Sequence, residues 1–87
     1  MKVFCCQLDS VWENKPANFD KVRKLMARTN VPPRSLVLLP EMFATGFSMN
    51  TAAIAEPYGG LTEHFLANAA REFSIFLMAG AAMRGRD

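Results

Sequence analysis

The sequence has few of the residues that bind metals or form disulfides, and it has no long apolar run. Its 87 residues include two cysteines, Cys5 and Cys6, which are adjacent. Neighbouring side chains of a strand point to opposite faces, so we expect these two to be small buried residues and not a disulfide. No apolar run reaches the ~18 residues of a membrane span, and the N-terminus lacks a signal-peptide pattern. These absences predict a cytoplasmic protein without a membrane partner.

A strong excess of charge is also missing, and this argues against nucleic-acid binding. Ten basic and eight acidic residues give a formal net charge of +2, with the basic residues concentrated in 21–28 and 84–86. A nucleic-acid-binding protein usually has a denser basic face or a recognisable binding module. We interpret the basic residues as a solvated helix face and expect no nucleic-acid partner. The composition, 51% hydrophobic and 21% charged, is typical of one small globular domain.

Motifs that bind phosphate or metal are absent as well. Gly59 and Gly60 precede a predicted helix, but neither G-x-G-x-x-G nor G-K-[ST] occurs, so a turn is favoured over a phosphate loop. The single histidine, His64, has no cysteine or second histidine nearby and is expected at the surface. The adjacent cysteines lie in a strand pattern that gives no reason for a lowered thiol pKa. We therefore expect no cofactor, no bound metal and no nucleophile among these residues.

The pattern that is present alternates strands and helices. Apolar residues at helical spacing predict two amphipathic helices, the first with Asn14 as a cap and Pro16 in its first turn. The middle strand is apolar on both faces, as expected of a parallel strand covered by helices. The predicted elements are a buried strand over 2–9, a helix over 16–28, a strand over 36–39, a long loop over 42–60, a helix over 61–73 and a strand over 74–83. This order predicts an α/β fold with right-handed crossovers, a parallel sheet and two open edges.

Glu41 draws attention because it follows the middle strand within an otherwise apolar segment. In an open α/β sheet, functional groups collect at the carboxyl ends of the strands. Apolar neighbours would desolvate this carboxylate and raise its pKa, which favours a general base. Position alone leaves a solvated loop carboxylate, or the cap of a short helical turn, as the alternative. The apolar neighbours are Leu39, Met42, Phe43 and Phe47.

The segment LVLLPEMFATGFSMN, residues 36–50, resembles the region around the catalytic glutamate of the nitrilase superfamily of carbon–nitrogen hydrolases. Within it, LPEMFATGFSM is most similar to the omega-amidase-like branch. Residues 3–22 resemble the first strand, loop and helix of that family, and residues 66–83 resemble its second helix and third strand. The resemblance implies an α-β-β-α sandwich, of which residues 1–87 would form the N-terminal βαβαβ part of a partial domain. It also implies hydrolysis of non-peptide carbon–nitrogen bonds through a Glu-Lys-Cys triad.

The resemblance assigns roles to three residues of this chain. Glu41 would be the general base that takes the thiol proton, and Phe43 and Phe47 would help wall the substrate pocket. No residue matches the lysine or cysteine motifs of the triad, so we interpret the chain as the N-terminal part of such an enzyme and expect it to be inactive alone. The full-length form would release ammonia from a small 2-oxo dicarboxylic acid monoamide through a thioester, and it would be a homo-oligomer.

Two other classes of function remain open at this point. A small receiver-like binding module would use Asp9, which ends the first predicted strand, and Glu41, which follows the second, to hold a divalent cation. A non-catalytic interaction protein would instead add its open sheet edge to a partner. The first predicts saturable magnesium binding, and the second predicts a defined hetero-complex.

Overall fold

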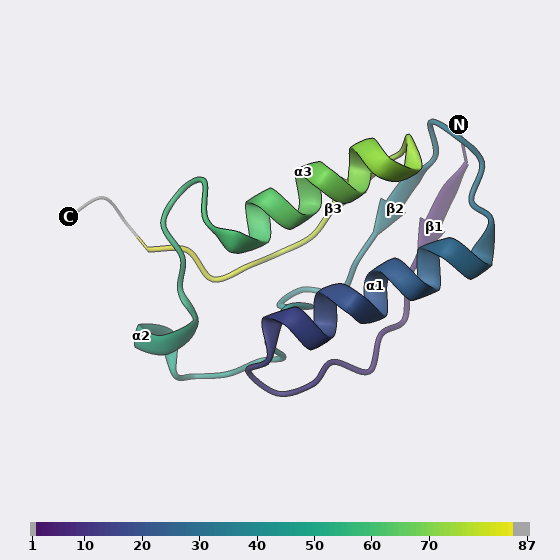
Figure 1. Ribbon diagram of the computed structural model, residues 1–87. Coiled ribbons are helices and arrows are strands. Elements are labelled where there is room, and N and C mark those ends of the chain that lie inside the picture. Colours follow the sequence, from purple (N-terminus) through teal and green to yellow (C-terminus); the bar gives the residue numbers. More distant parts are fainter. Residues whose placement is uncertain (1, 85–87) are drawn as a thin grey trace.

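The computed structural model describes residues 2–84 and consists of one parallel sheet with two long helices (Figure 1). β1 pairs with β2 and β2 pairs with β3, both in parallel, so the strand order is β1-β2-β3. No helix within residues 2–84 is long and apolar enough to cross a membrane. The predicted α/β fold with a parallel sheet is confirmed. The elements are β1 (Val3–Cys5), α1 (Lys15–Thr29), β2 (Leu36–Leu38), α2 (Thr51–Ile54), α3 (Leu61–Phe73) and β3 (Phe76–Met78).

The strand register divides the sheet residues between two faces. Residues that lie opposite one another share a face, and successive residues of one strand alternate between faces. Val37, the middle residue of β2, is fully buried and shares its face with its partners Phe4 and Leu77. The other face carries Val3, Cys5, Leu36, Leu38, Phe76 and Met78.

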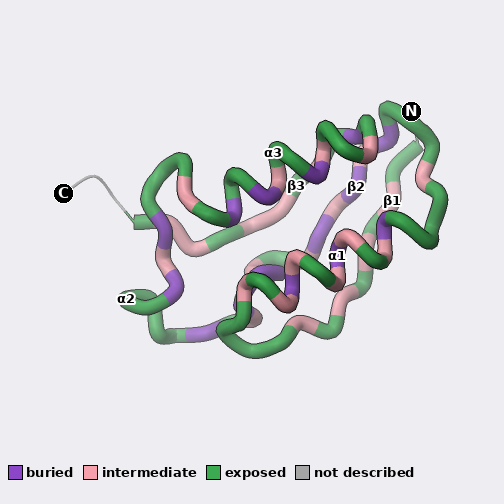
Figure 2. The backbone as a smooth tube through the Cα atoms, in the orientation of Figure 1, coloured by how far each residue is buried: buried purple, intermediate pink, exposed green. Residues whose placement is uncertain are grey.

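Both helices pack on the face that contains Val37. The two crossovers run in the same direction across the sheet, and right-handed crossovers of the same direction place their helices on the same side. Figure 1 shows α1 and α3 together in front of the strands. The opposite face is largely exposed within residues 2–84, with Val3 and Phe76 each 56% and Met78 62% exposed (Figure 2). The expectation that helices cover the middle strand on both faces is therefore wrong.

The same arrangement corrects the prediction for the first strand. β1 spans three residues, fewer than predicted, and it lies at an edge of the sheet. Cys5 is exposed because it points to the uncovered face, whereas Cys6 is half-buried. Burial raises the pKa of the Cys6 thiol, and the neighbouring Cys5 raises it further. The two thiols are free, as expected, but they are not both buried.

The core lies between the helices and the covered face of the sheet. Helix α1 begins as predicted, with the Asn14 side chain accepting a hydrogen bond from the Ala17 N–H at 3.1 Å. At the centre of the core, the rings of Phe19 and Phe65 stack with their centroids 4.3 Å apart. Both rings also approach Phe43, at centroid distances of 6.1 and 6.0 Å. The buried cluster comprises Val22, Met26, Val37, Leu39, Phe43, Ala44, Phe65, Ala69 and Ile75.

Candidate functional site

Glu41 lies at the carboxyl end of β2, in the turn that leaves the sheet. Hydrogen bonds on either side of it hold the backbone against the end of β3 and the segment that follows. The Leu39 N–H donates to the Met78 carbonyl, and the Met42 N–H donates to the Gly80 carbonyl, both at 2.9 Å. Met42 has a φ of +55°, a left-handed conformation that residues other than glycine seldom adopt. The turn therefore has a defined path across the end of the sheet.

The side chain of Glu41 is exposed and lies beside Gly80. A Cβ atom at position 80 would lie 3.3 Å from the Glu41 Cγ, so the missing side chain of Gly80 leaves room for this close approach. Leu39 and Phe43 are 7% and 0% exposed because they point into the core and away from the carboxylate. The expectation that apolar neighbours desolvate Glu41 is therefore wrong for this structure. Glu41 is accessible to solvent.

The two phenylalanines predicted to line a substrate pocket lie in different surroundings. Phe43 is fully buried beside the stacked rings of Phe19 and Phe65, so in this structure it anchors the turn from the core side. Phe47 is 68% exposed and follows the turn. The roles of Glu41, Phe43 and Phe47 at a substrate site stay predictions.

Glu56 is a buried carboxylate that the sequence reasoning missed. It is 6% exposed and accepts three hydrogen bonds: from the Lys15 Nζ at 2.5 Å, from the Thr62 N–H at 2.7 Å and from the Thr62 hydroxyl at 2.6 Å. Lys15 also donates to the Ile54 carbonyl at 2.7 Å. Burial alone would raise the pKa of Glu56, but the hydrogen bonds from Lys15 and Thr62 and the charge of Lys15 outweigh burial and lower it. The carboxylate is thus held in its ionised form.

The Glu56 backbone extends this connection to the segment after β3. The Glu56 N–H donates to the Ala82 carbonyl at 3.1 Å, and its carbonyl accepts from the Arg84 N–H at 2.7 Å. Glu56 therefore joins the start of α1, the start of α3 and the segment that contains Gly80. No local sequence pattern marks this residue, because its partner Lys15 is 41 residues away in the chain.

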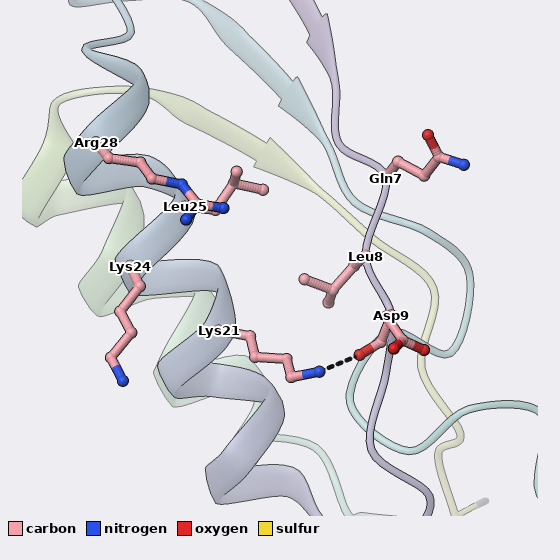
Figure 3. Close-up of a pocket in the computed structure, with 7 residues that line it drawn as sticks. All are labelled: Gln7, Leu8, Asp9, Lys21, Lys24, Leu25 and Arg28. Carbon is pink, nitrogen blue, oxygen red and sulfur yellow. Dashed lines mark hydrogen bonds between the residues drawn. The ribbon is translucent and has the colours of Figure 1, made fainter.

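Asp9 lies in a different environment from Glu41. It lines a cavity of about 290 Å³ between α1 and the loop after β1 (Figure 3), and the Lys21 Nζ donates to its backbone carbonyl at 2.5 Å. Three cationic side chains share this cavity and oppose a divalent cation, and Glu41 is not among its lining residues. Within residues 2–84, no three His, Cys, Asp or Glu side chains gather as metal ligands would. The receiver-like module thus gains no support. The lining residues are Gln7, Leu8, Asp9, Lys21, Lys24, Leu25 and Arg28.

Comparison with known proteins places these features in a family. The family model described as carbon–nitrogen hydrolase matches residues 2–87. The chain belongs to the carbon–nitrogen hydrolase family. It is similar to a nitrilase from Pyrococcus abyssi (strain GE5 / Orsay), with 30% identity over 92 residues that cover 100% of this chain and 35% of that relative. This carbon–nitrogen hydrolase chain thus spans about a third of the length of the curated relative it matches.

The architecture agrees with this assignment. The three-stranded parallel sheet of this carbon–nitrogen hydrolase chain, with α1 and α3 on one face, is consistent with the N-terminal part of the nitrilase fold. In an α-β-β-α layer order, each sheet carries helices on one face and a second sheet on the other. That order accounts for an apolar face that the helices leave open.

Proposed function

We propose that this chain is the N-terminal part of an omega-amidase-like enzyme in which Glu41 is the general base. The enzyme would hydrolyse the terminal amide of a small 2-oxo dicarboxylic acid monoamide to the acid and ammonia. The observation that supports this most strongly is the position of Glu41 in a chain of the carbon–nitrogen hydrolase family. Its exposed carboxylate lies at the carboxyl end of the middle strand, on a turn held by the hydrogen bond from Met42 to Gly80.

The proposed chemistry assigns one proton carrier to this chain. The Glu41 carboxylate takes the proton of the triad cysteine, and the sulfur forms a bond to the amide carbon while the triad lysine stabilises the oxyanion. The carbon–nitrogen bond then breaks, and nitrogen leaves as ammonia with the proton that Glu41 returns. Water attacks the resulting thioester, the carbon–sulfur bond breaks, and the acid and the thiol are regenerated.

The triad also predicts how the isolated chain behaves. None of its 87 residues matches the lysine or cysteine motifs, so the chain alone should release no ammonia from such a monoamide. An ammonia assay on the 87-residue protein tests this directly. Turnover by that protein, lost on Glu41→Gln, would show that the triad proposal is wrong.

A second test concerns the coding sequence that follows Asp87. The proposal expects codons for a lysine, and then for a cysteine followed by an aromatic and an acidic residue. In the protein that includes them, Glu41→Gln should lower kcat for ammonia release by about 10²- to 10⁴-fold, the usual contribution of a general base. Glu72→Gln is the matched control, because the Glu72 side chain is 53% exposed on α3. A Glu41→Gln enzyme as active as the control would exclude Glu41 as the base.

The quaternary structure of the full-length form stays a prediction. We propose a homo-oligomer, and light scattering of that form would check it. A monomeric full-length enzyme would exclude it.

A further inference from the structure

Asn18 is a fully buried polar residue near the start of α1, and its side chain joins two loops. Its Oδ1 accepts a hydrogen bond from the Val11 N–H at 2.7 Å. Its Nδ2 donates to the Val11 carbonyl at 2.8 Å and to the Ala44 carbonyl at 2.6 Å, so both of its hydrogens are used. Val11 belongs to the loop between β1 and α1, and Ala44 belongs to the turn that begins at Glu41. One amide group thus holds these two segments together.

The bond to Ala44 is part of a wider attachment of this turn. Three successive carbonyls of the turn accept hydrogen bonds from the loop after β1 and from α1. Asn18 is the fully buried donor of the three, and its bond to the Ala44 carbonyl is buried, so water is poorly placed to replace that bond. The pairs are Ser10 Oγ to Phe43 O at 2.8 Å, Asn18 Nδ2 to Ala44 O at 2.6 Å and Glu13 N to Thr45 O at 2.9 Å.

The chemistry of the three partners requires an amide at position 18. The Val11 N–H needs an acceptor, and the two carbonyls need donors. Aspartate at neutral pH has no hydrogen to donate, so its oxygens would face two carbonyl oxygens. Leucine has a similar size but would remove all three hydrogen bonds and leave the buried Ala44 carbonyl without its Asn18 donor. Glutamine is one methylene longer and would not fit the same positions.

We propose that Asn18 is a positioning residue for Glu41. Its amide fixes the turn through the Ala44 carbonyl on one side, while the Met42 to Gly80 hydrogen bond fixes it on the other. Both attachments lie just after Glu41, and the bond from the Leu39 N–H to the Met78 carbonyl holds the chain before it. Together these bonds restrict the path of the backbone at Glu41 and the direction in which its side chain leaves the sheet. The catalytic consequence rests on the function proposed for Glu41, but the restraint on the turn does not.

The first experiment uses the unmodified protein, so it does not depend on a variant that folds. Hydrogen exchange of asparagine side-chain amides is followed by NMR. The Nδ2 hydrogens of Asn18 should exchange at least about 100-fold more slowly than those of Asn68, which is exposed on α3. Equal exchange rates at the two residues would overturn the proposal.

The second experiment compares Asn18→Asp with the matched control Asn68→Asp. Loss of the restraint should speed backbone exchange at Thr45 and Gly46 by about tenfold or more, and leave the amides of β2 unchanged. Acid should partly restore protection in Asn18→Asp, because a protonated carboxyl can donate one hydrogen again. Faster exchange in β2 to the same extent would show a merely structural role, and no change at Thr45 and Gly46 would exclude any restraint.

The third measurement separates this proposal from the proposed function. In the protein that includes the triad lysine and cysteine, Asn18→Asp should lower kcat for ammonia release at least about tenfold with little change in KM, and Asn68→Asp should not. If the unmodified protein releases no ammonia, the proposed function fails, and the exchange experiments still decide whether Asn18 restrains the turn. If it is active and Asn18→Asp keeps its kcat, the positioning role is wrong.

Discussion

Replacing Glu56 with glutamine should destabilise the fold by about 2–3 kcal/mol near neutral pH. Glutamine keeps the shape but loses the charge and one acceptor. The Lys15 side chain is 17% exposed. In the variant its ammonium would keep the hydrogen bond to the Ile54 carbonyl but would lose the ion pair with the Glu56 carboxylate. Removing one partner of a buried pair usually costs about 3–5 kcal/mol. The remaining solvent access of Lys15 and its bond to Ile54 bring our value below that range.

The pH dependence of this effect follows from the pKa of Glu56. Burial alone would raise that pKa, but the hydrogen bonds from Lys15 and Thr62 and the charge of Lys15 lower it. A carboxyl with a lowered pKa in the folded state contributes stability that is present above its unfolded pKa, about 4.3. This contribution is lost as the pH falls through the folded pKa. The difference in unfolding free energy between the unmodified protein and Glu56→Gln should therefore shrink in acid below about pH 4.

Urea unfolding followed by circular dichroism measures this difference at each pH. For a domain of this length, the loss corresponds to a fall of roughly 10–20 °C in the thermal midpoint. Glu72→Gln is again the control, since a surface change of this kind usually stays within about 0.5 kcal/mol. Equal stabilities near neutral pH, or a difference that persists in strong acid, would refute the reasoning.

Three further predictions concern local contacts. Gly80→Ala should lower kcat of the complete enzyme several-fold and hardly change the thermal midpoint, because the new Cβ would lie 3.3 Å from the Glu41 Cγ; an unchanged kcat would contradict this. Iodoacetamide should modify Cys5 roughly tenfold faster than Cys6, because burial raises the pKa of the Cys6 thiol; peptide mass spectrometry would reveal the reverse order if the prediction is wrong. Asn14→Ala should cost about 1 kcal/mol in urea unfolding through loss of the α1 cap, and unchanged stability would show that the cap contributes nothing.

The features predicted correctly from the sequence are those with local signals. The second helix was predicted over residues 61–73, and α3 spans Leu61–Phe73. The cap at Asn14 and the middle strand were also correct. Helical spacing, capping residues and short apolar runs act over a few residues, so the sequence shows them directly.

The features predicted wrongly or missed depend on distant parts of the chain. Lys15 and Glu56 are 41 residues apart, and Asn18 and Ala44 are 26 residues apart, so no local pattern joins them. The exposure of Cys5 depends on which face of the sheet the helices cover. The face that the helices cover depends on the direction of both crossover connections. The residues of a single strand do not determine it. The position of Glu41 was predicted, but its exposure follows from neighbours that turn into the core.

The one-sided helical layer has a consequence for tolerance to substitution. The apolar side chains of the open face include Val3, Phe76 and Met78, and they gain little from folding of residues 2–84 because they stay in contact with water. Polar substitutions there should cost little stability in this chain, whereas at Val37 they should be severe. In a longer protein that covers the open face, the same substitutions would become as costly as those at Val37. A mutational scan of the strands therefore reports whether that face is covered, without any structure of the longer protein.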